Sequence, residues 1–153
     1  MKEAIMTGSF KTLSTSSRYI ALLALMSLSV ISPVAAADDV ISIELNKTDE
    51  TEQGCRPLFV FDNQSDHQLN AFQIELVLFD QKGVYSRQIL LDMAPLYREK
   101  KVVASFLISE TSCEDIGSML VNGLPRCANS AGDDLDCLAF LDVSSKSTIP
   151  LEK

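Results

Sequence analysis

The stretch from residue 55 to residue 92 constrains the fold most, because it holds three apolar runs separated by turn residues. In the middle run, residues 71–80, apolar side chains occupy every second position, which places them on one face of a strand. Residues 58–61 are continuously apolar, as is typical of a strand covered on both faces. Residues 80–83 have Asp first and Gly last, the pattern of a type I turn. The stretch therefore predicts an antiparallel meander of three strands: 55–62, 71–80 and 84–93.

Four further runs extend this meander. They predict strands at residues 38–46, 102–108, 116–121 and 138–143. Ser112 could instead cap a short helical turn before residue 116, although a strand is favoured there. Polar loops are expected at residues 47–54 and 127–137, and little order is expected after Ser144. Seven short strands, with turns about ten residues apart and no helical period, predict an all-β fold, an immunoglobulin-like β-sandwich.

The first 37 residues have the composition of an export signal. Lys2, Lys11 and Arg18 provide a positive start, residues 19–34 are mostly apolar, and three alanines at 35–37 suit signal cleavage. An uncleaved anchor is the alternative, but the apolar run is short and interrupted by serines. The sequence thus predicts a Sec-type signal peptide at residues 1–37 and a single β-sandwich domain at 38–153. The product would be periplasmic or secreted, with no membrane anchor after cleavage.

All four cysteines (Cys55, Cys113, Cys127 and Cys137) follow the predicted signal. An even number in an oxidising compartment indicates two disulfides, which can connect in three ways. A zinc site is disfavoured, because no two cysteines have ligand spacing and His67 is the one histidine. In an immunoglobulin-like arrangement the second and fifth strands pair antiparallel, and this brings Cys55 near Cys113. Cys127 and Cys137 flank the connection between the last two strands, whose ends are expected to meet as a long hairpin. Cys55–Cys113 and Cys127–Cys137 are therefore the favoured connectivity.

The charge of the chain limits its partners. It carries 13 basic and 21 acidic side chains; without the three basic and one acidic residues before position 38, ten basic and twenty acidic remain. Such a negative field repels phosphate backbones and anionic lipids, so nucleic-acid binding is not expected. It is compatible with a basic protein partner or with cations, and it also keeps a small exported protein soluble.

Catalytic patterns are weak. His67 is expected in a polar turn and no Gly-x-Ser-x-Gly elbow is present, so nucleophilic hydrolysis lacks its base and its motif. Acidic clusters such as Glu114 with Asp115 could serve a hydrolase only within a cleft. Residues 129–136 could offer oxygen ligands to calcium, but they lack the order of an EF-hand. No catalytic residue, metal ligand or cofactor is therefore assigned, and calcium binding by this loop stays open.

The aromatic side chains raise a question about surfaces. Phe59, Phe61, Phe79 and Tyr85 cannot all face one core if their strands alternate. An exposed aromatic patch would mark a protein-binding face, whereas the alternative is that both sheets use these rings to fill the core. Val77 and Phe79 also make the outer face of the third strand apolar near its end.

The run from Asn63 to Gly83 resembles the FxLYD type of extracytoplasmic immunoglobulin-like domain, whose signature is Phe-x-Leu-Tyr-Asp before a Gly turn. Residues 76–80 read Leu-Val-Leu-Phe-Asp, so Leu78 and Asp80 match it; the likeness covers about residues 55–108. The whole chain after residue 37, with four cysteines and Cys-Glu-Asp-Ile-Gly at 113–117, resembles a group of small periplasmic proteins of alphaproteobacteria that has no assigned activity. Both resemblances imply a binding or accessory module, and neither supplies a catalytic residue.

The sequence thus predicts an exported, non-enzymatic β-sandwich that acts as an accessory or protein-binding module, with another periplasmic protein as the expected partner. One alternative is an inhibitor of a basic enzyme such as a lysozyme, which the negative charge would suit. The other is a hydrolase that uses acidic side chains. The oligomeric state is left open.

Overall fold

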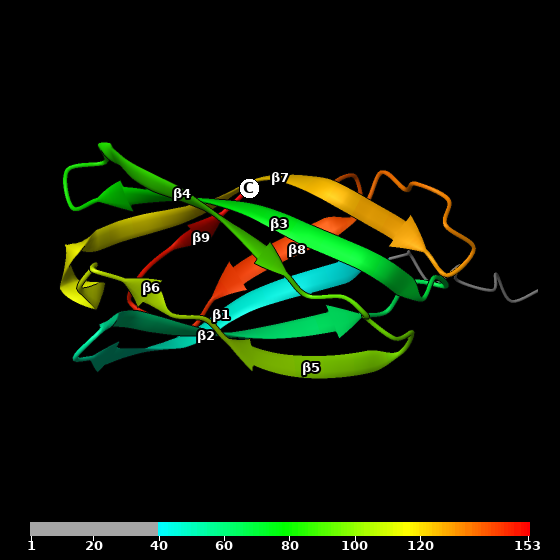
Figure 1. The fold of residues 1–153 in the computed structure, drawn as a ribbon, viewed down its shortest axis with the longest axis horizontal. Coiled ribbons are helices and arrows are strands. Elements are labelled where there is room, and N and C mark those ends of the chain that lie inside the picture. Colours follow the sequence, from blue (N-terminus) through cyan, green and yellow to red (C-terminus); the bar gives the residue numbers. More distant parts are fainter. Residues whose placement is uncertain (1–39) are drawn as a thin grey trace, which may run out of the picture. The chain divides into compact units, whose positions relative to one another are not determined.

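The structure, a computed structural model, describes residues 40–153, and the predicted signal peptide lies outside the described residues. The described chain is all-β apart from one three-residue 3-10 helix, η1 (Figure 1). Its elements are β1 (Ile41–Thr51), β2 (Gly54–Asn63), β3 (Leu69–Asp80), β4 (Tyr85–Asp92), β5 (Lys100–Ser105), β6 (Ile108–Ser109), η1 (Cys113–Asp115), β7 (Ile116–Asn129), β8 (Leu141–Ser145) and β9 (Leu151–Glu152).

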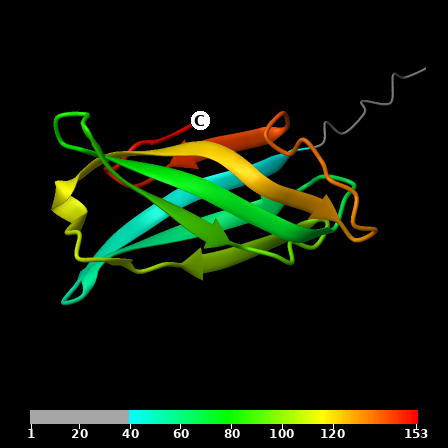
Figure 2. The same ribbon diagram turned by 45° about the horizontal axis from the view of Figure 1, so that its top comes forward.

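The strands form two sheets. The first sheet has the order β5-β2-β1-β8, with β6 also paired to β2, and the second has the order β4-β3-β7-β9. The views in Figures 1 and 2 show the two sheets lying one over the other. Neighbouring strands are antiparallel except at the ends of the sheets, where β8 runs parallel to β1 and β9 runs parallel to β7. The fold is therefore β-sandwich-like.

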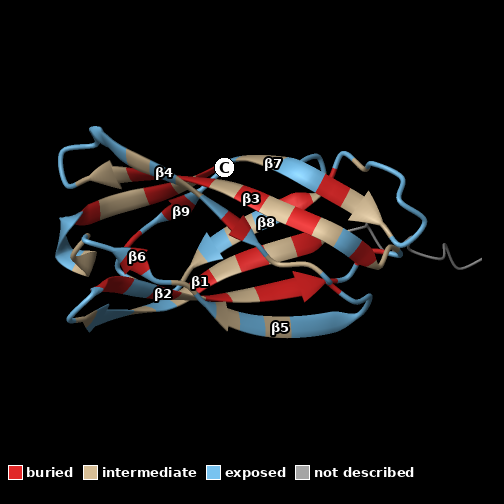
Figure 3. Cartoon of the chain, viewed as in Figure 1, coloured by how far each residue is buried: buried red, intermediate tan, exposed pale blue. Residues whose placement is uncertain are grey.

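One core lies between the sheets (Figure 3). Alternation in β1 and β3 supplies much of it, as their patterns predicted, because every second side chain of a strand points to the same face. The continuous apolar run of β2 behaves differently from the prediction: Phe59 and Phe61 are buried, but Leu58 and Val60 are only half-buried. The outer face of β2 thus lacks the second cover that its sequence suggested. Central core side chains are Ile41, Ile43, Leu45, Phe59, Phe61, Phe72, Ile74, Leu76, Leu78, Met119 and Val121.

Residues 40–153 form nine strands, so the predicted number of seven is wrong. The two additional strands, β6 and β9, are two residues long, which is too short to show a periodic pattern. The loop expected at residues 47–54 is instead the end of a hairpin in which Thr51 faces Gly54. Gly54 has a φ of 137°, and a Cβ there would collide with the carbonyl oxygen of Ile108. Glycine is required at this position both for the backbone conformation and for the space.

The region after β6 combines both interpretations of residues 112–121. Ser112 caps η1 by accepting a hydrogen bond from the Glu114 amide, and a strand follows directly. That strand, β7, runs through Cys127, so the predicted loop starts three residues later than expected. The expectation of little order after Ser144 is wrong, because the hydroxyl of Ser145 donates to the Ile149 carbonyl at 2.6 Å, and Ile149 is buried.

The two disulfides join Cys55 to Cys113 and Cys127 to Cys137, the pairs favoured from the strand order. The first connects β2 of the first sheet to η1, which leads into β7 of the second sheet. The premise of this first pair, the antiparallel pairing of β2 with β5, is confirmed. The second disulfide closes the connection that follows β7. The hairpin expected between the last two strands is wrong, because β7 and β8 lie in different sheets.

A buried polar side chain organises the connection between β2 and β3. The Asn63 amide nitrogen donates to the carbonyls of His67 at 2.8 Å and Leu96 at 3.2 Å. Its oxygen accepts from the amide and the hydroxyl of Ser65, at 3.1 and 2.7 Å. Both donors and both acceptor sites of this amide are therefore used, which offsets the cost of burying it. Asn63 thereby ties the β2–β3 connection to the segment that follows β4.

Candidate binding face

The outer face of the first sheet is mostly polar. Lys101 lies 3.3 Å from Asp62, and Lys146 lies 2.9 Å from Glu44. Val103 is the exposed apolar residue of this face, with 61% of its surface accessible. Its cross-strand partner Val60 is half-buried, and the paired charges lie beside these two valines, so this face has the character of an ordinary solvated surface.

Replacing Glu44 with glutamine tests how little the charges of this face contribute to the free energy of unfolding. The hydrogen bond from Asn46, and then that from Lys146, lower the pKa of Glu44. A carboxyl with a lowered folded pKa stabilises the fold above its unfolded pKa, and this is lost as the pH falls through the folded value. We expect Glu44→Gln to lower the free energy of unfolding by less than about 1 kcal/mol at neutral pH. Urea denaturation should show this difference vanish well below pH 4.5, and a difference that grows there would contradict the assignment.

The outer face of the second sheet is different, because its outward row on β3 ends in Val77 and Phe79. Val77 lies between Gln88 and Leu120, and Phe79 lies beside Tyr85. Side chains of residues paired across strands point to the same face, so apolar groups gather here. We call this set the outer apolar face; its members are Val77, Phe79, Tyr85, Leu90 and Leu120.

Exposure is concentrated on β4. Tyr85 and Leu90 are 59% and 57% exposed, whereas Val77 on the central strand β3 is nearly buried by its own neighbours. Of the four aromatic residues considered from sequence, Phe59 and Phe61 fill the core, Phe79 is half-buried on the outer face and Tyr85 is exposed. Two of the four rings therefore fill the core, and the other two lie on the outer face, where Tyr85 is the exposed one. The accessible apolar surface lies along one margin of the sheet.

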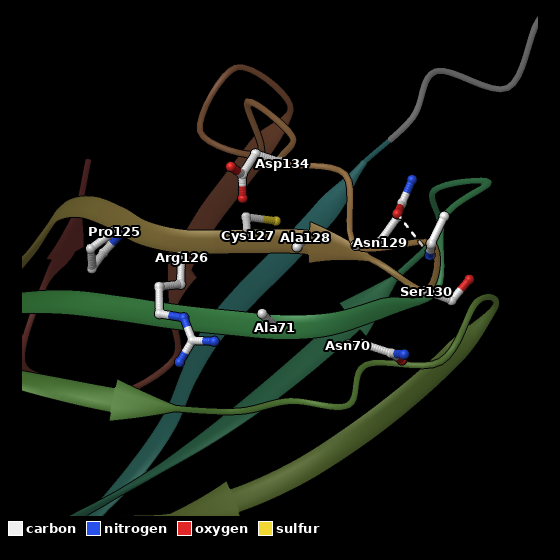
Figure 4. Close-up of a pocket in the computed structure, with 11 residues that line it drawn as sticks. Asn70, Ala71, Pro125, Arg126, Cys127, Ala128, Asn129, Ser130 and Asp134 are labelled. Atoms are coloured by element: carbon white, nitrogen blue, oxygen red, sulfur yellow. Dashed lines mark hydrogen bonds between the residues drawn. The ribbon is translucent and has the colours of Figure 1, made fainter.

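A polar hollow of about 440 Å³ lies farther along the same sheet (Figure 4). Ala71 and Ala128 pair across β3 and β7 there, and their small side chains leave the space open. The loop after β7 folds back so that Asp134 forms a bridge with Ala128. Arg126 projects across β3, as Figure 4 shows. The hollow is shallow and polar, so it resembles the margin of a binding surface more than an enclosed ligand site.

In the loop considered for calcium binding, residues 129–136, the first side chain forms hydrogen bonds within the loop itself. The Asn129 oxygen accepts from the amides of Ala131 and Asp133, at 2.9 and 3.0 Å. Its nitrogen donates to the Asp133 carboxylate at 3.1 Å. Within residues 40–153 no group of three or more His, Cys, Asp or Glu residues is arranged to hold a metal ion. The loop is therefore built as a turn held by its own amide side chain.

The remaining polar candidates lie apart. Glu114 and Asp115 are in η1, which precedes β7, whereas Asp133, Asp134 and Asp136 follow β7. A strand of 14 residues at about 3.3 Å per residue separates these two acidic clusters. The structure does not combine them into one carboxylate site. His67 lies in the β2–β3 connection, where its carbonyl accepts from Asn63.

Comparison with known proteins identified no match: the chain matches no protein-family model, no curated protein and no solved structure. Among residues 40–153, no helix has the length and apolar character needed to cross a membrane. Any inference about function therefore rests on the fold and on the surfaces of the described residues.

Proposed function

We propose that this chain is an exported, non-enzymatic protein-binding module with an immunoglobulin-like fold, and that it binds through the outer apolar face. The observation that carries the proposal is the contrast between the two sheets. One outer face pairs its charges, whereas the other exposes more than half of Tyr85 and of Leu90 at one margin. Tyr85 and Leu90 lie on the same face of one strand, with Gln88 between them, and large exposed apolar side chains gathered in this way are typical of an interaction surface.

Two disulfides among residues 40–153 support an oxidising compartment. The apolar segment at residues 19–34 adds the means of export, so we infer a periplasmic or secreted location. Two facing sheets, with β2 paired antiparallel to β5 within one of them, support the immunoglobulin-like relationship. The binding partner is therefore expected to be another protein of the cell envelope.

The negative charge favours one more specific version, the inhibition of a basic enzyme such as a lysozyme. The chain carries a net charge of −8, and Glu75 and Asp92 border the exposed Leu90. Opposite charge accelerates the encounter of such partners and makes it dependent on salt. An inhibition assay with a cationic lysozyme at low salt distinguishes this version from a binding module without inhibitory activity.

Photo-crosslinking in an envelope extract tests the proposed function. A photoreactive amino acid at Tyr85 or at Leu90 should capture the same partner. The control position is Val103, which is equally exposed but lies on the outer face of the first sheet. Capture of that partner with equal yield at Val103, or of none at Tyr85 and Leu90, would contradict binding by the outer apolar face.

Leu90→Lys should weaken that captured interaction by about tenfold or more, because it places a charge in the apolar contact. The free energy of unfolding should change by no more than about 0.5 kcal/mol, since the side chain is mostly exposed. Val103→Lys is the matched control and should leave the affinity unchanged. Affinity for the captured partner, measured with urea denaturation of each variant, checks both parts.

A further inference from the structure

Strand β4 is a sheet edge, and its residues 88–92 lie beyond the bulge at Ser86 and the charged Arg87. It pairs with β3 alone, and its eight residues include no proline, glycine or lysine. Native proteins usually blunt exposed edges with lysine, proline or very short strands. Three other edges show those devices: β5 starts with Lys100 and Lys101, β9 has two residues, and the part of β7 beyond β9 contains Pro125. The remaining edge, β8, also lacks lysine and proline, but it has only five residues.

The backbone of β4 offers regularly spaced hydrogen-bonding groups at this edge. The Met93 amide donates to the Phe72 carbonyl on β3 at 2.9 Å. Because hydrogen bonding alternates along an antiparallel strand, the amides of residues 91 and 89 also face β3. Those of Asp92, Leu90 and Gln88 then face away from the sheet. These three residues are exposed, so their N–H and C=O groups are open to a further strand.

The side chains at this edge suit a particular kind of strand. Tyr85 and Leu90 present apolar surface on the outer face, next to the carboxylates of Glu75 and Asp92. The one basic side chain of β4, Arg87, is held elsewhere, since its guanidinium donates to the Ser109 carbonyl at 2.8 Å. The carboxylates thus lie on the outer face of this edge, whereas Ile89 and Leu91 lie on its inner face. Such an edge complements a strand that alternates residues, with basic side chains on the outer face and apolar side chains on the inner face.

We propose that β4 binds an extended segment of a partner protein as an added antiparallel or parallel strand, and that this segment alternates apolar residues with Lys or Arg. This inference rests on the proposed function and specifies how binding occurs. A second copy of the chain is disfavoured as the occupant, because its net charge of −8 would bring like charge to the same edge. Main-chain hydrogen bonds supply affinity in such strand addition, and side chains supply specificity.

Three synthetic peptides of the length of β4, eight residues, test the proposal. The first alternates Lys and Val, the second alternates Glu and Val, and the third is the Lys–Val peptide with alternate amides methylated. The Lys–Val peptide should bind about tenfold or more tightly than either control, because only it has both the charge and the donors. On saturation, hydrogen exchange at the amides of Gln88, Leu90 and Asp92 should slow about tenfold or more, while that of the β5 amides stays unchanged.

Gln88→Pro removes one backbone donor at the edge without changing the charge, so it should weaken binding of the Lys–Val peptide about tenfold. Gln88→Ala keeps that donor and should change the affinity for the peptide by less than about twofold. Equal binding of the methylated and unmethylated peptides to the unsubstituted protein would overturn strand addition, whatever the folding of the proline variant. The proposed function would survive that result if Tyr85 still crosslinks a partner. A dimer that dissociates in Gln88→Pro would also overturn the proposal, because the occupant would be a second copy.

Discussion

Replacing Cys55 and Cys113 together with alanine is expected to lower the free energy of unfolding by about 4 kcal/mol. The bond closes a loop of 58 residues, and the entropy that a cross-link removes from the unfolded chain grows with loop length. Cys55 is also fully buried beneath η1, so its loss removes packing as well. Reversible urea denaturation of the two proteins, with equal slopes, measures the difference.

The second disulfide provides the matched comparison. Cys127 and Cys137 are only ten residues apart, so their replacement with alanine should cost less, about 2.5–3 kcal/mol. The order of the two losses is the informative result. If removing the ten-residue bridge costs as much as removing the 58-residue bridge, restriction of the unfolded chain does not explain their contribution.

Asn63→Ala is expected to lower the free energy of unfolding by about 3 kcal/mol, because it leaves buried groups without partners. The substitution removes the donors to His67 and Leu96 and the acceptor for Ser65, which is itself buried. Unsatisfied buried groups cost more than the hydrogen bonds themselves contribute, so the loss should exceed that of an ordinary surface residue. Urea denaturation gives the size of the loss.

Asn70→Ala is the control for this prediction. Asn70 is exposed at the start of β3 and accepts one side-chain hydrogen bond, from Gln68. Its replacement should change the free energy of unfolding by less than about 0.5 kcal/mol. Similar losses for the two asparagines would mean that the Asn63 network does not hold the β2–β3 connection in place.

Much of the fold could be predicted from the sequence, because alternation is a local property. The pattern of β3 was enough to place Phe72 and Ile74 in the core and Val77 on the outer face. The Cys55–Cys113 pair followed from the pairing of β2 with β5, whereas Cys127–Cys137 forms without the hairpin that was expected to bring it together. The hairpin end at Thr51 could not be predicted, because its residues are polar and pair without contributing to the core.

The outer apolar face was only partly predictable. Residues 89–91 read Ile-Leu-Leu, so nothing local indicates which of them points outward. The structure decides this through a register shift in the β3–β4 pairing, where Tyr85 faces Phe79 and Arg87 faces Leu78, so that Ser86 is the extra residue. That β4 lies at an edge is a property of topology, which depends on pairings between residues far apart in the sequence.

The parallel pairs at the ends of both sheets bear on when this chain can acquire its native form. Ile41 pairs with Leu141, and Met119 pairs with Leu151. Neither sheet can therefore be complete without residues from the last part of the chain. A polypeptide that passes through a secretion channel amino end first, as the proposed export requires, would lack these closing strands until residue 152 emerged. If the proposed export holds, both sheets can close only after the last strand has left the channel, so folding is completed on the far side of the membrane.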